Sequence, residues 1–166
     1  MRNTLIAVAA LAALASCANR PEPLPPQQQS APPVVAQPPQ GPVAGSIEDF
    51  RVSVGDRVFF GYDRFDLSPE ARSALERQAA WLRQYPGVRV LLAGNCDERG
   101  TREYNIALGA RRAAAARDYL ISLGVAGTRM ETVSYGKERP LDPRANEEAW
   151  SVNRNANTQI VSGAVS

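Results

Sequence analysis

The stretch from residue 88 to residue 123 constrains the fold of this chain more than any other. An apolar run, Val88-Arg89-Val90-Leu91-Leu92-Ala93, has the pattern of a strand and leads into a glycine-bounded loop. A helix is predicted from Thr101 to Leu123, where a glycine ends it. The first N–H groups of such a helix have no partner within it, so they point toward the loop.

Several kinds of polar group are expected to gather at this loop. Asp97 lies in the loop itself, and the helix positions one turn apart from Thr101 are Asn105, Gly109 and Arg112. Because these positions share one face, a carboxylate, a carboxamide, a guanidinium and free backbone donors surround one small volume. Gly109 is expected to leave space beside them. The combination suits a ligand that carries both an ammonium and a carboxylate group.

The remainder of the chain after residue 45 alternates strand and helix patterns. Strands are predicted at 57–61, 88–93, 130–134 and 157–162, and helices at 69–85, 101–123 and 147–153. Ser68 is a favourable N-cap, and Pro69 suits the first helical position. The alternation predicts an α+β sandwich with helices on one face of a mixed four-stranded sheet.

The N-terminus predicts export and lipid attachment. Residues 1–17 hold Arg2, an apolar run and then Leu14-Ala15-Ser16-Cys17, which resembles a lipobox with Cys17 as the lipid-bearing residue. The apolar run is too short for a permanent transmembrane helix. A plain secretory signal that ends near a cysteine is the alternative. Residues 18–45 are rich in Pro, Gln, Ala and Val and are predicted to form a disordered linker before a domain of residues 46–166.

The composition argues against several classes of protein. The chain has no histidine and only two cysteines, so a zinc site or a base-activated thiol lacks its usual partners. Cys96 is therefore expected to be a small structural side chain. A formal net charge of +2 gives no electrostatic case for nucleic acid binding. No enzyme activity, metal or cofactor is predicted.

Five motifs occur in order along residues 57 to 162. They are Val58-Phe59-Phe60-Gly61-Tyr62-Asp63, Asp66-Leu67-Ser68-Pro69-Glu70-Ala71, Gly94-Asn95-Cys96-Asp97-Glu98-Arg99-Gly100-Thr101-Arg102-Glu103-Tyr104-Asn105, Val133-Ser134-Tyr135-Gly136-Lys137-Glu138 and Trp150-Ser151-Val152-Asn153-Arg154. Together they resemble the OmpA-like peptidoglycan-binding domain family, in the form found in peptidoglycan-associated lipoproteins. The resemblance implies the order β-α-β-α-β-(α)-β.

The resemblance also assigns roles to the two central residues. Asp97 matches the aspartate that binds the ammonium group of diaminopimelate, the diamino acid of the peptidoglycan stem peptide. Arg112 matches the position that holds a ligand carboxylate, which a guanidinium can grip through two parallel hydrogen bonds. The adjacent Arg111 points about 100° away, so only one of these two arginines can face the loop.

Other candidate ligand-binding residues have open alternatives. Asn105 can contact the ligand or fix the loop, and Thr101 can serve only as the helix N-cap. Arg99 can contact a ligand carboxylate or position Asp97, and Asp97 itself can instead cap the helix or pair with Arg99. By resemblance, backbone groups of the loop before the first long helix contribute to the pocket, at Phe65, Asp66 and Leu67.

The chain departs from the family pattern at two positions. Asn95 stands where histidine is frequent, and Asn155 stands where a second arginine usually follows Arg154. Neither change affects Asp97 or Arg112, so ligand binding is expected to survive.

The resemblance implies an outer-membrane lipoprotein, anchored through lipid on Cys17, with its domain in the periplasm. It would bind peptidoglycan without covalent chemistry and engage TolB and TolA. As part of the Tol–Pal system it would maintain envelope integrity and outer-membrane constriction during cell division. One alternative is an OmpA-like lipoprotein of another envelope system. Another is a peptidoglycan hydrolase, for which the chain shows neither histidine nor a paired-carboxylate pattern.

Overall fold

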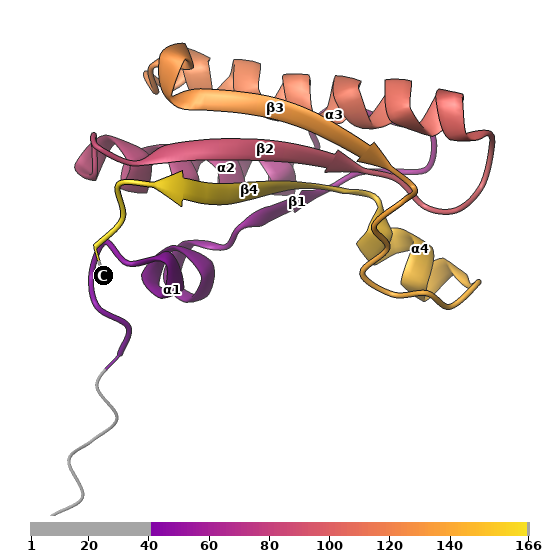
Figure 1. Cartoon of the computed structure of the whole chain (residues 1–166), viewed down its shortest axis with the longest axis horizontal. Helices are drawn as coiled ribbons and strands as arrows, with labels where there is room; N and C mark the ends of the chain where they lie inside the picture. The colour runs from indigo at the N-terminus through magenta and orange to yellow at the C-terminus, as the bar shows by residue number, and fades with distance from the viewer. Residues whose placement is uncertain (1–40, 166) are drawn as a thin grey trace, which may run out of the picture. The chain divides into compact units, whose positions relative to one another are not determined.

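Four strands form one mixed sheet in the order β1-β4-β2-β3 (Figure 1). They span Arg57–Phe59 (β1), Arg89–Asn95 (β2), Met130–Gly136 (β3) and Asn155–Ser162 (β4). β4 is antiparallel to both β1 and β2, whereas β2 and β3 are parallel. The computed structural model describes residues 41–165. The predicted signal segment of residues 1–17 and most of the predicted linker of residues 18–45 lie outside the described residues.

Two long helices, α2 (Pro69–Gln84) and α3 (Arg102–Ser122), cover one face of this sheet. Their buried residues, such as Leu75, Leu82 and Leu120, form one core with Val58, Val90 and other inward-facing strand residues. A short helix, α4 (Glu147–Asn153), precedes β4. The chain enters β1 through α1 (Ile47–Asp49) and a π-helical turn (Phe50–Val54), and a 3₁₀ turn (Gly127–Arg129) precedes β3. The predicted α+β class is confirmed.

The order of elements also agrees with the sequence pattern. The helix predicted at residues 147–153 has those bounds, and the Ser68 hydroxyl accepts the Ala71 N–H at 3.2 Å as an N-cap. Three strands extend further than predicted, β2 to Asn95, β3 to Gly136 and β4 back to Asn155, whereas β1 ends at Phe59, two residues early. The sequence analysis did not predict α1 and the turn after it, because a segment of eight residues contains too few helical repeats.

The backbone of the first half of α3 packs directly against the backbone at the end of β2. A Cβ atom on Gly94 would lie 1.8 Å from the Gly109 carbonyl oxygen, and one on Gly109 would lie 2.3 Å from Ser134 Oγ. The prediction that Gly109 leaves space for a ligand is therefore wrong, because β2 and Ser134 occupy that space. The contact instead fixes the first half of α3 against the end of β2, which sets the position of Asn105 and Arg112 relative to Asp97.

Candidate functional site

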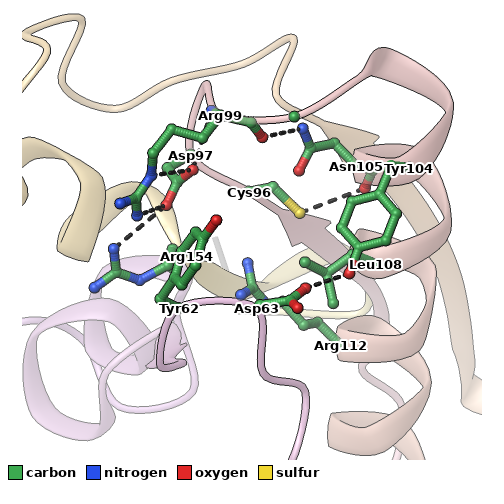
Figure 2. A pocket seen from close by; sticks show the side chains of 11 residues that line it. Tyr62, Asp63, Cys96, Asp97, Arg99, Tyr104, Asn105, Leu108, Arg112 and Arg154 are labelled. Atoms are coloured by element: carbon green, nitrogen blue, oxygen red, sulfur yellow. Dashed lines mark hydrogen bonds and ion pairs between the residues drawn. The ribbon is translucent and has the colours of Figure 1, made fainter.

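A pocket opens at the end of the sheet where β2 stops and α3 begins (Figure 2). Its volume is about 210 Å³. Three segments contribute to it: the loop between β1 and α2, the β2–α3 loop with the first turns of α3, and the junction of α4 and β4. The lining residues are Tyr62, Asp63, Cys96, Asp97, Arg99, Gly100, Tyr104, Asn105, Leu108, Arg112 and Arg154.

The β1–α2 loop forms one wall of the pocket. Asp63 has a φ of 56°, which reverses the chain at this point. The reversal directs Tyr62 and Asp63 toward the pocket, with Tyr62 61% exposed. The Tyr104 hydroxyl donates a hydrogen bond to the Asp63 carboxylate, which raises the pKa of Tyr104. This bond joins the loop to α3 across the pocket.

Phe65, Asp66 and Leu67, which the sequence analysis expected at the pocket, do not line it. The Asp66 carboxylate pairs with Arg64 at an exposed position. The guanidinium carbon of Arg111 lies over the Phe65 ring, 5.7 Å from the ring centroid. Leu67 packs against the core. The physical reason is a turn closed by the Arg64 N–H and the Gly61 carbonyl oxygen at 3.2 Å, after which these three side chains are engaged in the contacts just described.

Asp97 is buried and already holds two guanidinium groups. Arg99 Nη2 lies 2.5 Å from Asp97 Oδ2, and Arg154 Nη1 lies 3.3 Å from the same oxygen. Asp97 Oδ1 accepts from the Arg99 backbone N–H and from Arg99 Nε. Burial alone pushes the pKa of Asp97 up, but the hydrogen bonds from Arg99 and Arg154 outweigh it and hold the pKa below its ordinary 3.8. The alternative in which Asp97 pairs with Arg99 is the arrangement that the structure shows.

We expect this lowered pKa to make the fold sensitive to acid. Asp97 stabilises the folded state at every pH above its unfolded value near 3.8, and that contribution is lost as pH falls through the lower folded value. Urea unfolding between pH 5 and about pH 2 should therefore show a decline in the free energy of unfolding. The decline should be smaller in Asp97→Asn. An unchanged slope in that variant would show that Asp97 does not contribute.

Arg99 is held between two aromatic rings. Its guanidinium lies 4.1 Å from the centroids of both Tyr62 and Trp150. The Trp150 indole N–H in turn donates to Glu98 at 3.1 Å. Arg99 thus joins the β1–α2 loop, the β2–α3 loop and α4 at the rim of the pocket.

Arg112 is fully buried beneath the pocket, with an exposed fraction of 0%. Its Nε, Nη1 and Nη2 atoms donate to the carbonyl oxygens of Arg64, Asn95 and Gly61 at 2.8, 2.8 and 3.1 Å. Burial lowers the pKa of Arg112. Because three of the five N–H groups of a guanidinium are engaged, this side chain ties the β1–α2 loop to the end of β2 rather than standing free for a two-point grip. Arg111 is exposed and outside the pocket, as the helix geometry predicted.

Asn105 and Thr101 both stabilise the β2–α3 loop. Asn105 Nδ2 donates to the carbonyl oxygens of Arg99 and Thr101 at 2.7 and 3.1 Å, while its side chain lines the pocket. Thr101 Oγ1 accepts the Tyr104 N–H at 3.2 Å and is the N-cap of α3, outside the pocket lining. Of the two roles open to Thr101, the structure therefore shows the cap.

Several residues of the pocket were not predicted from the sequence. Arg154 is 7% exposed and connects Asp97 with Glu147, whose carboxylate accepts from Nη2 at 2.7 Å. It ends the motif Trp150-Ser151-Val152-Asn153-Arg154, whose resemblance to the family assigned it no contact with the ligand. Tyr104 and Leu108 lie one turn apart on α3, so the helical spacing that selected Asn105 and Arg112 could have found them.

Cys96 lies in the pocket floor and is 3% exposed. Its thiol donates to the Asn105 carbonyl oxygen at 3.4 Å, and burial raises the pKa of this thiol. We expect a chain with Cys17→Ser to react with a thiol reagent on the order of a hundredfold more slowly when folded than in urea. Equal rates at pH 8 would show that this part of the pocket opens freely.

No group of three or more His, Cys, Asp or Glu side chains within residues 41–165 is arranged to hold a metal ion. Within the same range, none of the helices combines the length and the apolar character needed to cross a membrane.

Comparison with known proteins shows which family this chain belongs to. Residues 59–154 match the family model described as "OmpA family". The chain belongs to the OmpA family. The match includes every lining residue of the pocket, from Tyr62 to Arg154.

Several curated relatives of this chain carry the same name, peptidoglycan-associated lipoprotein. The chain is 46% identical over 160 residues to the peptidoglycan-associated lipoprotein of Mesorhizobium japonicum, covering 96% of this chain and 92% of the relative. It is 54% identical over 120 residues to the protein of the same name from Rhizobium meliloti, covering 72% of this chain and 68% of the relative.

Solved structures show the same architecture. The peptidoglycan-associated lipoprotein from Burkholderia pseudomallei has a TM-score of 0.62 and 40% identity, over 63% of this chain and 89% of that one. The C-terminal domain of Helicobacter pylori MotB has a TM-score of 0.61 and 22% identity, over 64% of this chain and 84% of that one. At that identity the second likeness shows the fold alone.

Proposed function

We propose that this protein binds peptidoglycan without covalent chemistry, with the free end of a diaminopimelate side chain in the pocket of Asp97. The observation that carries the proposal is the presence of both charge signs in one pocket of about 210 Å³. Asp63 and Asp97 offer carboxylates to an ammonium group, and Arg99 and Arg154 offer guanidinium groups to a carboxylate. Diaminopimelate in a stem peptide presents one free group of each kind.

The ion pairs within the pocket suggest how such a ligand enters. The four contacts to the two oxygens of Asp97 come from Arg99 and Arg154, so a ligand ammonium must replace one of them. Arg99 can turn from Asp97 to the ligand carboxylate while the ligand ammonium takes its place. Binding is then an exchange of one set of ion pairs for another, which leaves a small net gain and a weak, reversible attachment.

The position of the pocket suits attachment of the chain to a membrane. Ser46 and Val165 form a parallel bridge beyond the C-terminal end of β4, whereas the pocket lies beyond its N-terminal end, where Arg154 lines it. At about 3.3 Å per residue, the eight residues of β4 separate these ends by roughly 23 Å. In our proposal Cys17 carries the lipid and residues 18–45 act as the linker. At about 3.1 Å per residue, 28 residues extend to at most about 87 Å.

Tethering compensates for weak binding at a single pocket. A domain held near a polymer that repeats the same stem peptide experiences a high effective concentration of ligand. We therefore propose an outer-membrane lipoprotein whose domain faces the periplasm and holds the wall. The shared name of the curated relatives, peptidoglycan-associated lipoprotein, supports this reading and is not the name of an enzyme.

The partners TolB and TolA, and a role in envelope integrity and division within the Tol–Pal system, belong to the same proposal. Their support is the identity of 46% and 54% to those relatives. Co-purification of TolB with the full chain tests it. Recovery of components of another envelope system instead would favour the alternative lipoprotein role.

Retention on purified sacculi tests the pocket. We expect Asp63→Asn combined with Asp97→Asn to reduce retention about tenfold or more, because both carboxylates for the ammonium group are lost. Asp118→Asn is the matched control, since that carboxylate is 72% exposed on α3 outside the pocket. Thermal unfolding of each variant confirms that it is folded. Equal retention of a folded double variant and the control would overturn the pocket assignment.

A further inference from the structure

A second polar hollow lies on the sheet face that α2 and α3 leave uncovered. In β4, Ala156 belongs to the core and Thr158 Oγ1 donates to Gln78 of α2 at 2.8 Å. Because side chains alternate along a strand, Asn155, Asn157 and Gln159 face the opposite side. They line a hollow of about 150 Å³ together with Arg57, Asn95, Tyr135, Arg139 and Leu141.

Arg57, which lines this hollow, carries an unsatisfied donor. Within residues 41–165, Arg57 Nε is the only buried side-chain nitrogen or oxygen without a hydrogen-bond partner. Arg57 Nη1 is fixed on Asp56 at 3.0 Å, so the guanidinium cannot turn to satisfy Nε without losing that bond. Because that Nε atom is itself shut off from solvent, the donors of Arg57 that a bound oxygen atom can reach are the remaining N–H groups of its guanidinium, on a side chain that is 31% exposed.

The carboxamides around Arg57 leave acceptors open. Asn157 Nδ2 donates to the backbone carbonyl and the carboxylate of Asp56, and Asn95 Nδ2 donates to Ala93 O and to Asn155 Oδ1. These bonds fix the orientation of both amides. The Oδ1 atoms of Asn95 and Asn157 accept no hydrogen bond within the described part of the chain. The hollow thus combines free acceptor oxygens with a free guanidinium donor.

That combination selects the chemistry of the ligand. Free amide oxygens disfavour an anion, and the guanidinium groups of Arg57 and Arg139 disfavour a cation. A sugar hydroxyl both donates and accepts, so vicinal hydroxyls can satisfy amide oxygens and a guanidinium together.

We infer that this hollow binds a neutral, N-acetylated sugar unit of a glycan strand. The inference rests on the proposed binding of peptidoglycan and adds the glycan to the stem peptide as a ligand. Asn95 in the hollow and Asp97 in the pocket are two residues apart, so one polymer can reach both sites. An adjoining hollow shares Arg57, Asn157 and Gln159, although its other β4 residues, Thr158 and Ile160, point to the core side of the strand. On the uncovered face, Asn155, Asn157 and Gln159 follow roughly 13 Å of strand, which gives space for a short oligosaccharide.

Titration of the isotope-labelled full chain with chitohexaose tests the inference by NMR, in a detergent without sugar headgroups. This oligomer of N-acetylglucosamine carries no peptide, so it cannot occupy the pocket of Asp97 through diaminopimelate. We expect saturable shifts of the side-chain amides of Asn95, Asn157 and Gln159. Gln159→Leu should weaken binding about fivefold, the effect of one lost hydrogen bond. Arg57→Met should weaken it at least as much.

Two controls separate this inference from the proposed function. Asp97→Asn should leave the titration with chitohexaose unchanged, and Gln159→Leu should leave binding of a diaminopimelate tripeptide unchanged. Tripeptide binding without any response to chitohexaose would overturn the glycan site alone. A response to chitohexaose without tripeptide binding would overturn the pocket alone. Shifts confined to Tyr62, Tyr104 and Asp97, or binding of a peptide of residues 18–45 in place of the sugar, would also overturn the glycan site.

Discussion

Gly94→Ala is expected to destabilise the fold by about 3 kcal/mol or more, because the new Cβ atom has no space. The ideal position of that atom is 1.8 Å from the Gly109 carbonyl oxygen and 2.6 Å from its carbonyl carbon. These are backbone atoms of α3, so the overlap can be relieved only by moving the helix away from β2. In an ordinary strand the same substitution gains about 0.5–1 kcal/mol, so the expected sign is reversed here.

Gly87→Ala is the matched control for this prediction. A Cβ atom on Gly87 would meet no atom within 4 Å. Urea unfolding, followed by the fluorescence of Trp81 and Trp150, measures the free energy of unfolding of both variants. A Gly94→Ala variant as stable as Gly87→Ala would show that α3 does not approach β2 as closely as described.

Arg112→Lys is expected to lower the free energy of unfolding by about 3 kcal/mol. Lysine carries a point charge on a flexible stem and cannot reach the three carbonyl oxygens of Gly61, Arg64 and Asn95 together. At least one buried carbonyl group then loses its partner, and the ammonium group remains buried. The same unfolding measurement applies.

Arg111→Lys provides the control, since Arg111 is the neighbour of Arg112 on the same helix and its side chain is exposed. It should change stability by less than about 0.5 kcal/mol. Similar losses in the two variants would contradict the structural role of Arg112. Because Arg112 holds the β1–α2 loop in place, reduced peptidoglycan binding by an Arg112 variant can result from a displaced loop as well as from a lost contact to the ligand.

Local patterns in the sequence predicted the elements of this fold well. The run of residues 88–93 and the helix after Thr101 depend on short-range periodicity and on an N-cap, which one sequence displays directly. The same periodicity placed Asn105 and Arg112 on the face that meets the pocket and excluded Arg111. The class of the fold followed from the alternation of these patterns.

Contacts between distant segments could not be predicted in this way. Arg154 reaches Asp97 across 57 positions in the sequence. Arg112 uses its guanidinium on carbonyl oxygens, which every residue possesses, so no side-chain pattern identifies its partners. Gly109 is a further example: a helical glycine can leave a space or admit a neighbouring backbone, and only the packing against Gly94 decides between them.

The loop before α2 shows the same limit at short range. The loop contains an aromatic residue followed by an aspartate twice, at Tyr62-Asp63 and at Phe65-Asp66, and Leu67 follows the second pair. Which of them faces the pocket depends on the φ of 56° at Asp63. Aspartate adopts this conformation more readily than most residues, but the sequence alone does not require it there.

We propose above that the pocket beside Asp97 recognises the free ammonium and carboxylate groups of diaminopimelate. NMR titration of the labelled full chain with two muropeptides, one with diaminopimelate and one with lysine at the third position, tests it most directly. Lysine lacks the second carboxylate, so we expect about tenfold weaker binding of that muropeptide. The shifts produced by the diaminopimelate form should centre on Tyr62, Asp97 and Tyr104. Equal affinity for the two muropeptides, or shifts that leave these three residues unchanged, would contradict the claim.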